Sequence, residues 1–169
     1  MRKITVLLFL LSLTCFGQQK EPKIYEIDGI QVKSYNFDSF QSYLKFDDDT
    51  TYVINFWATW CLPCVKELPY FELLHSKYKD KKVKVILVSL DMPKKIESNL
   101  IPFINKKKLQ SEVIHLNDPD ANTWIEKVDK NWGGSIPATY IYNQKGHAFY
   151  ERSFNFEDLE KEVLTLLNK

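Results

Sequence analysis

Two cysteines, Cys61 and Cys64, are the residues whose type and spacing point most directly to chemistry. They follow an apolar, β-branched and aromatic run at residues 53–60, which is typical of a buried strand. Apolar residues at helical spacing come after the pair. The two thiols therefore lie where a strand passes into a helix, and thiols three residues apart at that place can open and close a disulfide.

The start of the expected helix should make the first thiol more acidic. Its first turn has unpaired N–H groups and the positive end of the helix dipole, so we expect the pKa of Cys61 to fall below the ordinary value of about 8.5. Cys64, one turn later, can attack a mixed disulfide on Cys61. The bridge would stabilise the fold by only about 2 kcal/mol, which suits cycling better than structural support. Pro63 fits the first turn, where an N–H is not needed.

A Cys-x-x-Cys pair is also half of many zinc sites, which need a second pair of ligands. The remaining cysteine is Cys15, and the three histidines, His75, His115 and His147, are scattered without zinc-type spacing. We therefore expect no metal and no cofactor besides the redox-active pair itself. A purely structural disulfide is the other alternative.

The segment Asn-Phe-Trp-Ala-Thr-Trp-Cys-Leu-Pro-Cys at residues 55–64, followed by Glu67 and Pro69, resembles the active site of the TlpA/ResA-type thiol–disulfide oxidoreductases. These are envelope-located members of the thioredoxin superfamily. The resemblance covers about residues 30–168 and is weaker outside this motif and the Ile-Pro step at 136–137. It implies an α/β thioredoxin fold: a central mixed β-sheet flanked by helices, with an N-terminal β-hairpin and a central inserted strand–helix segment.

The resemblance also gives expectations for the residues around the thiol pair. The Ile136–Pro137 peptide should be cis and should face the cysteines. The main chain around Ser135 and Ile136 should then be free to pair with an extended substrate, with Leu62 beside it in the substrate groove. Trp60 should shield the disulfide and form part of the docking surface, whereas we expect Trp57 to lie in the core.

Asn55 departs from the classical cytosolic thioredoxins, which have a buried Asp there as proton acceptor for the inner cysteine. Because Asn cannot titrate, deprotonation of Cys64 must involve another group, water or the partner thiol. Glu67, which resembles the usual Glu of the family, and Asp91, at the end of the next strand, are the candidate carboxylates. The alternative is that both are surface acids.

Pattern and turn residues predict the other elements of the chain. The second strand of a βαβ unit should lie parallel to the first. The predicted elements are a hairpin turning at Asp28-Gly29, a helix at 36–46, the active-site helix ending near Asp80, a strand at 83–90, a helix at 92–107 kinked or split by Pro102, a strand at 112–115, a helix at 118–129 capped by Asp118 with Pro119 at its first position, a hairpin at 138–151, and a last helix capped by Asn155.

The first 17 residues have the pattern of a secretory signal: basic residues, an apolar run at 4–13, then small or polar residues. Cleavage after this signal would leave a single thioredoxin-like domain, 18–169, in the periplasm or cell envelope of a bacterium. Lipid modification of Cys15 is an alternative that Thr14, large for its position, disfavours. The formal net charge of +1, from 23 basic and 22 acidic residues, predicts no nucleic-acid partner.

These features predict a protein-disulfide reductase or related thiol–disulfide oxidoreductase, with Cys61 as nucleophile and Cys64 as resolving thiol. The resemblance points to the reducing direction, for example keeping apocytochrome c thiols reduced in cytochrome c biogenesis. The implied partners are disulfide-containing extracytoplasmic proteins and a membrane thiol–disulfide electron donor, with the chain a monomer.

Three other functions are open on the same fold. A disulfide-forming oxidase would use the same pair in the opposite direction. A thiol peroxidase normally needs Pro-x₃-Thr-x₂-Cys, whereas Thr59 stands two residues before Cys61 and no proline has the right place. The third is a non-catalytic module, either a redox-inert binding domain or a copper-handling one. Copper carriers of this fold use Cys-x₃-Cys and a distant His, a different spacing from the one present.

Overall fold

The side chains of β3 (Thr51–Trp57), the central strand, alternate between two apolar cores. Val53 and Trp57 belong to one core, and Ile54 and Phe56 to the other. Every residue of the strand is buried, as expected for a strand covered on both faces. The structure is a computed structural model that describes residues 21–168. The predicted signal and Cys15 lie outside these residues.

Seven strands form one mixed sheet in the order β1-β2-β5-β4-β3-β6-β7. The strands besides β3 are β1 (Lys23–Ile27), β2 (Ile30–Tyr35), β4 (Val83–Ser89), β5 (Glu112–Leu116), β6 (Ala138–Asn143) and β7 (Gly146–Tyr150). The pairs β3–β4, β4–β5 and β2–β5 are parallel, and the pairs β1–β2, β3–β6 and β6–β7 are antiparallel. The predicted parallel βαβ unit is therefore confirmed.

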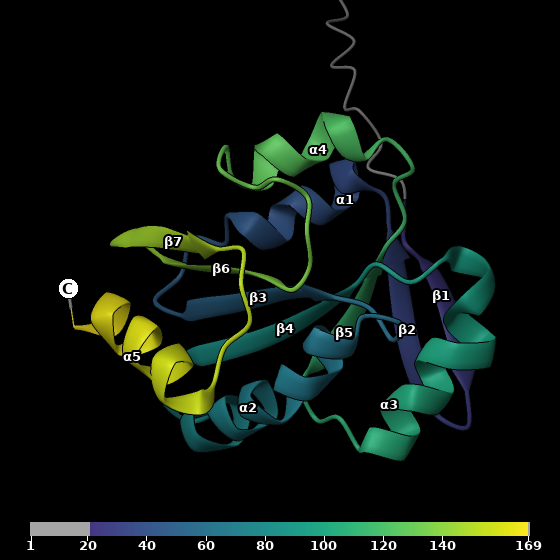
Figure 1. Cartoon of the computed structure of the whole chain (residues 1–169), viewed down its shortest axis with the longest axis horizontal. Coiled ribbons are helices and arrows are strands. Elements are labelled where there is room, and N and C mark those ends of the chain that lie inside the picture. The colour runs from purple at the N-terminus through teal and green to yellow at the C-terminus, as the bar shows by residue number, and fades with distance from the viewer. Residues whose placement is uncertain (1–20, 169) are drawn as a thin grey trace, which may run out of the picture.

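Helices cover both faces of this sheet (Figure 1). One core contains side chains of α2 (Leu62–Tyr78), α3 (Ile101–Lys107) and α5 (Phe156–Leu167). The other contains those of α1 (Phe37–Phe40) and α4 (Ala121–Val128). This is the predicted thioredoxin fold, with β1–β2 as its N-terminal hairpin and with β5 and α4 as the inserted strand and helix.

The hairpin turn has the backbone that the sequence predicts. Asp28 and Gly29 have φ angles of 51° and 78°, the left-handed conformation that two-residue hairpin turns require and that Asp-Gly supplies. The hairpin joins the sheet through the parallel pairing of β2 with β5, so the chain before the central βαβ unit extends the same sheet.

The predicted start of α4 is wrong. The helix begins at Ala121, with Asp120 as N-cap residue and no side-chain cap, and not after Asp118. The Asp118 carboxylate instead accepts hydrogen bonds from the Phe37 N–H at 3.1 Å and the Asp120 N–H at 3.2 Å. It therefore ties α1 to α4, a contact between residues distant in sequence that outweighs a local capping pattern.

Two other predicted helices are shorter than expected. The segment at 36–46 forms α1 and then a 3₁₀ turn, Gln41–Leu44. The segment at 92–107 is split into a 3₁₀ turn, a π-helical stretch at Ile96–Leu100, and α3. Pro102, in the first turn of α3, has no N–H to give to the preceding turn, so the predicted interruption is confirmed.

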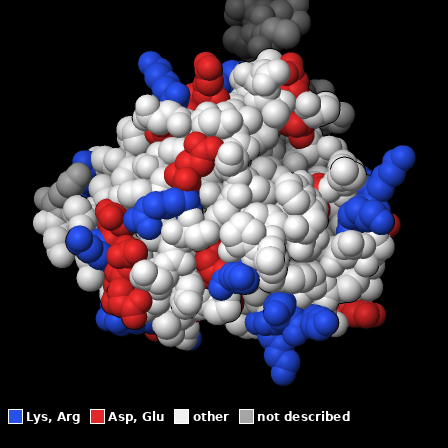
Figure 2. All heavy atoms as spheres, viewed as in Figure 1, with Lys and Arg blue, Asp and Glu red and all other residues white. Residues whose placement is uncertain are grey.

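Charged side chains of both signs share the face of the molecule shown in Figure 2, in keeping with the small net charge. Among the helices that the structure describes, none has the length and hydrophobicity needed to cross a bilayer.

Asn155 accepts a hydrogen bond from the Asp158 N–H at 2.8 Å, which confirms it as the N-cap of α5. Replacing Asn155 by Ala should lower the free energy of unfolding by about 1 kcal/mol, because one N–H of the first turn loses its partner. Urea denaturation measures this change. Asn122→Ala, an exposed asparagine inside α4, is the matched control. An equal loss in both variants would contradict a capping role.

Candidate functional site

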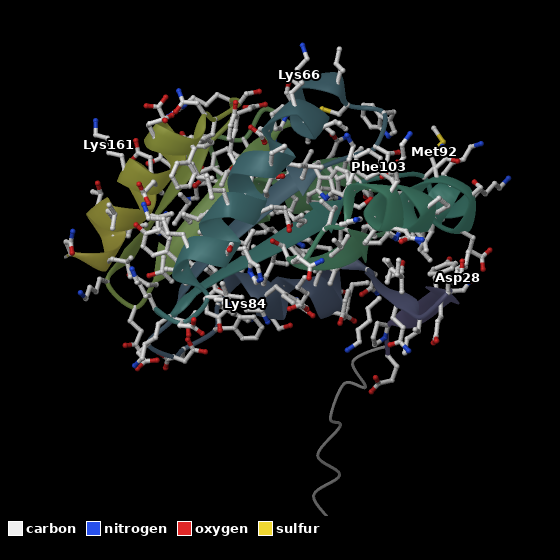
Figure 3. The ribbon with its side chains drawn as sticks, turned by 90° about the horizontal axis from the view of Figure 1, so that it is seen from below. Asp28, Lys66, Lys84, Met92, Phe103 and Lys161 are labelled. Carbon is white, nitrogen blue, oxygen red and sulfur yellow. A yellow bond between two sulfur atoms is a disulfide. The ribbon has the colours of Figure 1, made fainter. Side chains whose placement is uncertain are left out.

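The thiol pair lies at the junction between β3 and α2, as predicted. β3 ends at Trp57 and α2 begins at Leu62, with Cys61 as its N-cap residue in extended conformation. Cys61 Sγ accepts a hydrogen bond from the Cys64 N–H at 3.3 Å. The two cysteines form a disulfide, with their Cα atoms 5.3 Å apart. In Figure 3 this end of α2, marked by Lys66, lies at the edge of the molecule with the disulfide sulfur beside it.

The surroundings of the two sulfur atoms differ. Cys61 is 6% exposed and lies between Trp60 and Leu62, which are 66% and 64% exposed, whereas Cys64 is fully buried. Pro63 is exposed in the first turn of α2. Cys61 is thus the sulfur that an incoming disulfide can reach, with apolar side chains on both sides of it.

The segment before β6 faces this pair. The Ile136–Pro137 peptide is cis, as the resemblance implies, and the carbonyl oxygen of Ile136 lies 3.7 Å from Cys61 Sγ. The expectation of a free main chain at Ser135 is wrong. Its N–H donates to Glu151 at 2.7 Å and its carbonyl accepts from the Trp132 indole at 2.9 Å, so both groups are already used.

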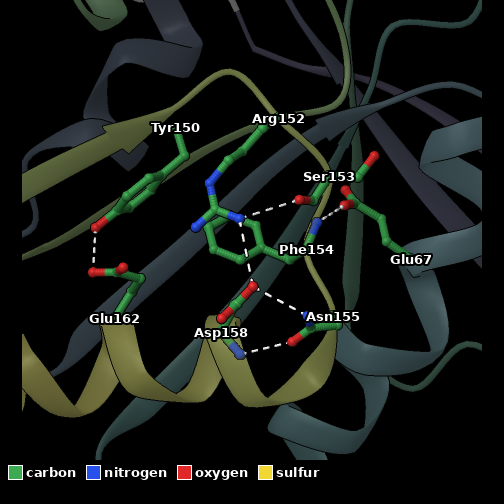
Figure 4. Close-up of polar contacts among 8 residues, drawn as sticks. All are labelled: Glu67, Tyr150, Arg152, Ser153, Phe154, Asn155, Asp158 and Glu162. Carbon is green, nitrogen blue, oxygen red and sulfur yellow. Dashed lines mark hydrogen bonds and ion pairs between the residues drawn. The ribbon is translucent and has the colours of Figure 1, made fainter.

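Glu67 lies one helical turn after Cys64 and is 1% exposed. Its carboxylate accepts a hydrogen bond from Asn55 Nδ2 at 2.9 Å. It also accepts one from the Phe154 N–H at 2.8 Å, shown in Figure 4. Burial raises the pKa of Glu67 to about 7, although those two donors and the charge of Arg152 act to lower it. A surface location is excluded, and Glu67 is a carboxyl that can take or release a proton near neutral pH.

Asp91 is also buried, two residues after the end of β4. Its carboxylate accepts from the Thr59 N–H at 3.0 Å, the Thr59 hydroxyl at 2.5 Å and the Ser89 hydroxyl at 2.9 Å. Thr59 stands two residues before Cys61. These hydrogen bonds fix the loop that leads into α2, so the surface alternative is excluded for Asp91 as well.

A buried histidine, His115, contacts the main chain of Asp91. His115 Nε2 lies 2.8 Å from the carbonyl oxygen of Asp91, and its Nδ1 lies 2.7 Å from Ser34 Oγ. Because a carbonyl only accepts, Nε2 carries the hydrogen, and the neutral ring accepts from Ser34 through Nδ1. Burial lowers the pKa of His115, which favours that neutral form.

Several residues of the site have no signal in the local sequence. Trp132 and Glu151 hold the loop before Pro137, and the Phe154 N–H holds Glu67 from 87 positions away. No spacing rule connects such residues; only the fold brings them together. Within residues 21–168 no group of three or more His, Cys, Asp or Glu side chains is arranged to hold a metal ion.

Comparison with known proteins agrees with this geometry. The chain matches the AhpC/TSA family over residues 30–150. It is 30% identical over 152 residues to the thiol-disulfide oxidoreductase ResA of Oceanobacillus iheyensis, which spans 84% of this chain and 74% of that protein. The thioredoxin-like protein YneN of Bacillus subtilis is 32% identical over 97 residues, 56% of this chain and 51% of the relative.

Solved structures show the same fold. StoA from Bacillus subtilis aligns with a TM-score of 0.54 at 21% identity, over 83% of this chain and 96% of StoA. A secreted disulfide oxidoreductase of Mycobacterium tuberculosis aligns with a TM-score of 0.59 at 17% identity, over 88% and 96% of the two chains. With a Cys61–Cys64 disulfide at the start of α2 and these relatives, the chain belongs to the AhpC/TSA family of thioredoxin-like proteins and, within it, to the thiol–disulfide oxidoreductases of the ResA type.

Proposed function

We propose that this protein reduces disulfides of extracytoplasmic proteins through Cys61 and Cys64, in a role like that of cytochrome c maturation, where apocytochrome thiols must stay reduced. The observation that carries the proposal is the sulfur of Cys61 at the N-cap of α2. Its bond from the Cys64 N–H and the helix dipole favour the thiolate, which is the attacking species.

The reaction moves two electrons from the enzyme to the substrate. The Cys61 thiolate attacks one sulfur of the substrate disulfide, forms a mixed disulfide and releases the other substrate sulfur as a thiolate. Cys64, deprotonated, then attacks Cys61 Sγ, closes the Cys61–Cys64 disulfide and releases the second substrate thiolate. A dithiol donor of the membrane reduces the enzyme again by the reverse exchange.

The second step requires a proton acceptor for Cys64, which is buried. We assign this role to Glu67, because it is buried on the same helix one turn away and its pKa of about 7 matches a neutral-pH exchange. Both oxygens of Asp91 already receive hydrogen bonds from the loop and from Ser89. A supporting role for that loop suits Asp91 better than proton transfer.

Asn55 is compatible with this assignment. Its amide has both a donor and an acceptor, so after a flip it can hydrogen-bond Glu67 in the protonated form as well as the ionised one. Its Oδ1 is buried and has no partner within the described chain. A carboxylate at this position would instead add a second negative charge next to Glu67.

A location outside the cytoplasm is part of the proposal. The pattern of residues 1–17 supports a secretory signal with a single domain after it, and Cys15 gives lipid anchoring as the alternative. Similar structures are those of secreted proteins from Mycobacterium tuberculosis and Corynebacterium glutamicum, which supports the same location.

The direction of exchange is tested by the reduction potential of the Cys61–Cys64 pair. Equilibration with glutathione or dithiothreitol buffers, read by alkylation, should give a value near the thioredoxin end of the range, about −270 mV. A value near about −120 mV would identify a disulfide-forming oxidase instead. Rapid consumption of peroxide would favour a thiol peroxidase. The Thr59 hydroxyl, the nearest counterpart of the threonine in the peroxidase motif, already donates to Asp91.

Replacing single cysteines separates the two thiol roles. Cys64→Ser should accumulate a covalent complex with a disulfide-containing protein, because the mixed disulfide on Cys61 has lost its resolving thiol. Cys61→Ser is the matched control and should trap little, since the remaining thiol is buried. Non-reducing electrophoresis measures both. Equal trapping by the two variants would refute the assignment of nucleophile and resolving thiol.

Glu67→Gln should change both chemistry and stability. Near neutral pH the closing of the Cys61–Cys64 disulfide should slow by at least about tenfold in single-turnover experiments, because the general base is gone. With its pKa raised to about 7, Glu67 is protonated more readily in the folded state than in the unfolded chain. The contribution of protonated Glu67 to the unfolding free energy is therefore complete below about pH 4.5 and is lost as the pH rises through 7.

Over this window the unfolding free energy of the wild type should therefore fall by roughly 3 kcal/mol relative to that of Glu67→Gln, whose amide stays neutral. Glu97→Gln, at an exposed site, serves as the control. A difference independent of pH would show that Glu67 does not titrate there, and an unchanged rate would remove it as the base.

A further inference from the structure

The loop between α4 and the cis proline is fixed from two sides by groups that lie outside the thiol pair. Glu151 Oε2 accepts from the Gly133 N–H at 2.8 Å, and its Oε1 accepts from the Ser135 N–H at 2.7 Å. On the other side, Trp132 Nε1 donates to the Ser135 carbonyl at 2.9 Å. A loop with these three bonds cannot rearrange without breaking charge-assisted hydrogen bonds.

The indole at the start of this loop is anchored in the core. Trp132 is buried and its ring packs on Phe56, Trp124 and Phe149, with centroids 4.6, 5.6 and 5.6 Å away. Gly134 follows with a φ of 94°, which a residue with a side chain rarely adopts. The loop is thus rigid at its start, and the Glu151 carboxylate fixes the part nearest to the cis proline.

These bonds determine which main-chain groups a substrate can use. Both groups of Ser135 are taken, whereas no hydrogen bond among the described residues uses the Ile136 N–H. The Ile136 carbonyl lies 3.7 Å from Cys61 Sγ. An extended substrate that pairs with the main chain here can pair only with Ile136. This fixes the register of the substrate relative to Cys61 Sγ.

We propose that Glu151 is a positioning residue for protein substrates. Its carboxylate holds residues 133–135 so that Ile136 alone presents its main chain beside Cys61, which aligns a disulfide-bearing strand with the attacking sulfur. The proposal rests on the proposed function, because it concerns how that same site receives a protein disulfide. A small disulfide that makes no main-chain pairing does not need the loop, and this difference makes the proposal testable.

Burial alone would raise the pKa of Glu151, but the hydrogen bonds from Gly133 and Ser135 outweigh it and hold the pKa below the ordinary range. The side chain is therefore ionised at neutral pH, where its two acceptor bonds are strongest. Glu151 is exposed at the surface, so its replacement leaves no buried charge unpaired.

The experiment compares two substrates with the full-length protein, a protein disulfide such as oxidised insulin and the small aromatic disulfide DTNB. Glu151→Ala should raise KM for the protein disulfide by about tenfold, with kcat, the DTNB rate and the Cys61–Cys64 potential changed by less than about twofold. Glu151→Gln, which keeps one acceptor oxygen, should show a smaller rise. Glu126→Gln, at an exposed position on α4, is the matched control and should match wild type.

A second variant approaches the same contact from the loop. A methyl group on Gly133 would lie 3.3 Å from both Glu151 carboxylate oxygens, so Gly133→Ala should push the carboxylate aside and raise KM in the same direction. Combined with Glu151→Ala it should add nothing further, because the contact is already lost. Additive effects would contradict the proposed pairing.

Two outcomes would overturn the inference: no change in either substrate, or an equal slowing of protein disulfide and DTNB, which would mean that Glu151 acts on the thiols or on stability. Thermal unfolding of each variant distinguishes an effect on the thiols from an effect on stability. If the wild type reduces DTNB but no protein disulfide, the proposed function fails. If the wild type reduces both and the Glu151 variants behave like it, only the role of Glu151 fails.

Discussion

A thiol can attack a disulfide only as a thiolate, and a thiolate that is partly removed from water needs donors to replace the water. In this protein the Cys64 N–H is such a donor, 3.3 Å from Cys61 Sγ, and the helix that provides it starts directly after the sulfur. The remaining parts of the site can be understood by what they do for this junction. Asp91 fixes the loop that enters it, and the Ile136 carbonyl lies 3.7 Å from the sulfur.

At the buried Glu67, hydrogen-bond donors replace the lost water less completely than at Cys61. Few donors compensate for the loss of water, so its proton is held more tightly than in an ordinary carboxyl. The same segment of chain contacts Glu67 through the Phe154 N–H and the loop at 133–135 through Glu151. Four residues, 151–154, therefore connect the group that we assign to proton transfer with the loop that we assign to substrate alignment, which gives the two parts a common support.

The sequence was sufficient where structure is encoded locally. The buried strand β3, the Asp28-Gly29 turn, the Asn155 cap and the position of the thiol pair all depend on neighbours within a few residues. The family resemblance added the thioredoxin fold and the cis peptide at Ile136–Pro137. These are the parts of the fold and site that a single chain specifies without tertiary information.

Predictions failed where a hydrogen-bond partner distant in sequence determines the local structure. Asp118 looked like a helix cap, but the Phe37 N–H competes for its carboxylate from another part of the chain. Ser135 looked free because proline removes a neighbouring donor, yet Glu151 and Trp132 use both of its main-chain groups. Nothing in the spacing of these residues signals the contacts. The Glu151 contact forms where the residue after β7 meets the loop before β6, and the Asp118 contact forms at the start of α1.

The histidine under the active-site loop has a further consequence. Ser34, His115, Ser89 and Trp57 are register partners across β2, β5, β4 and β3, so a row of paired residues leads from the N-terminal hairpin to the end of the central strand. A shortened chain beginning after Tyr35 would leave the Nδ1 of a buried imidazole without its hydroxyl partner. The ring would then be free to tilt away from the Asp91 carbonyl, and the hairpin, although remote from the sulfur atoms, would change how the nucleophile is presented.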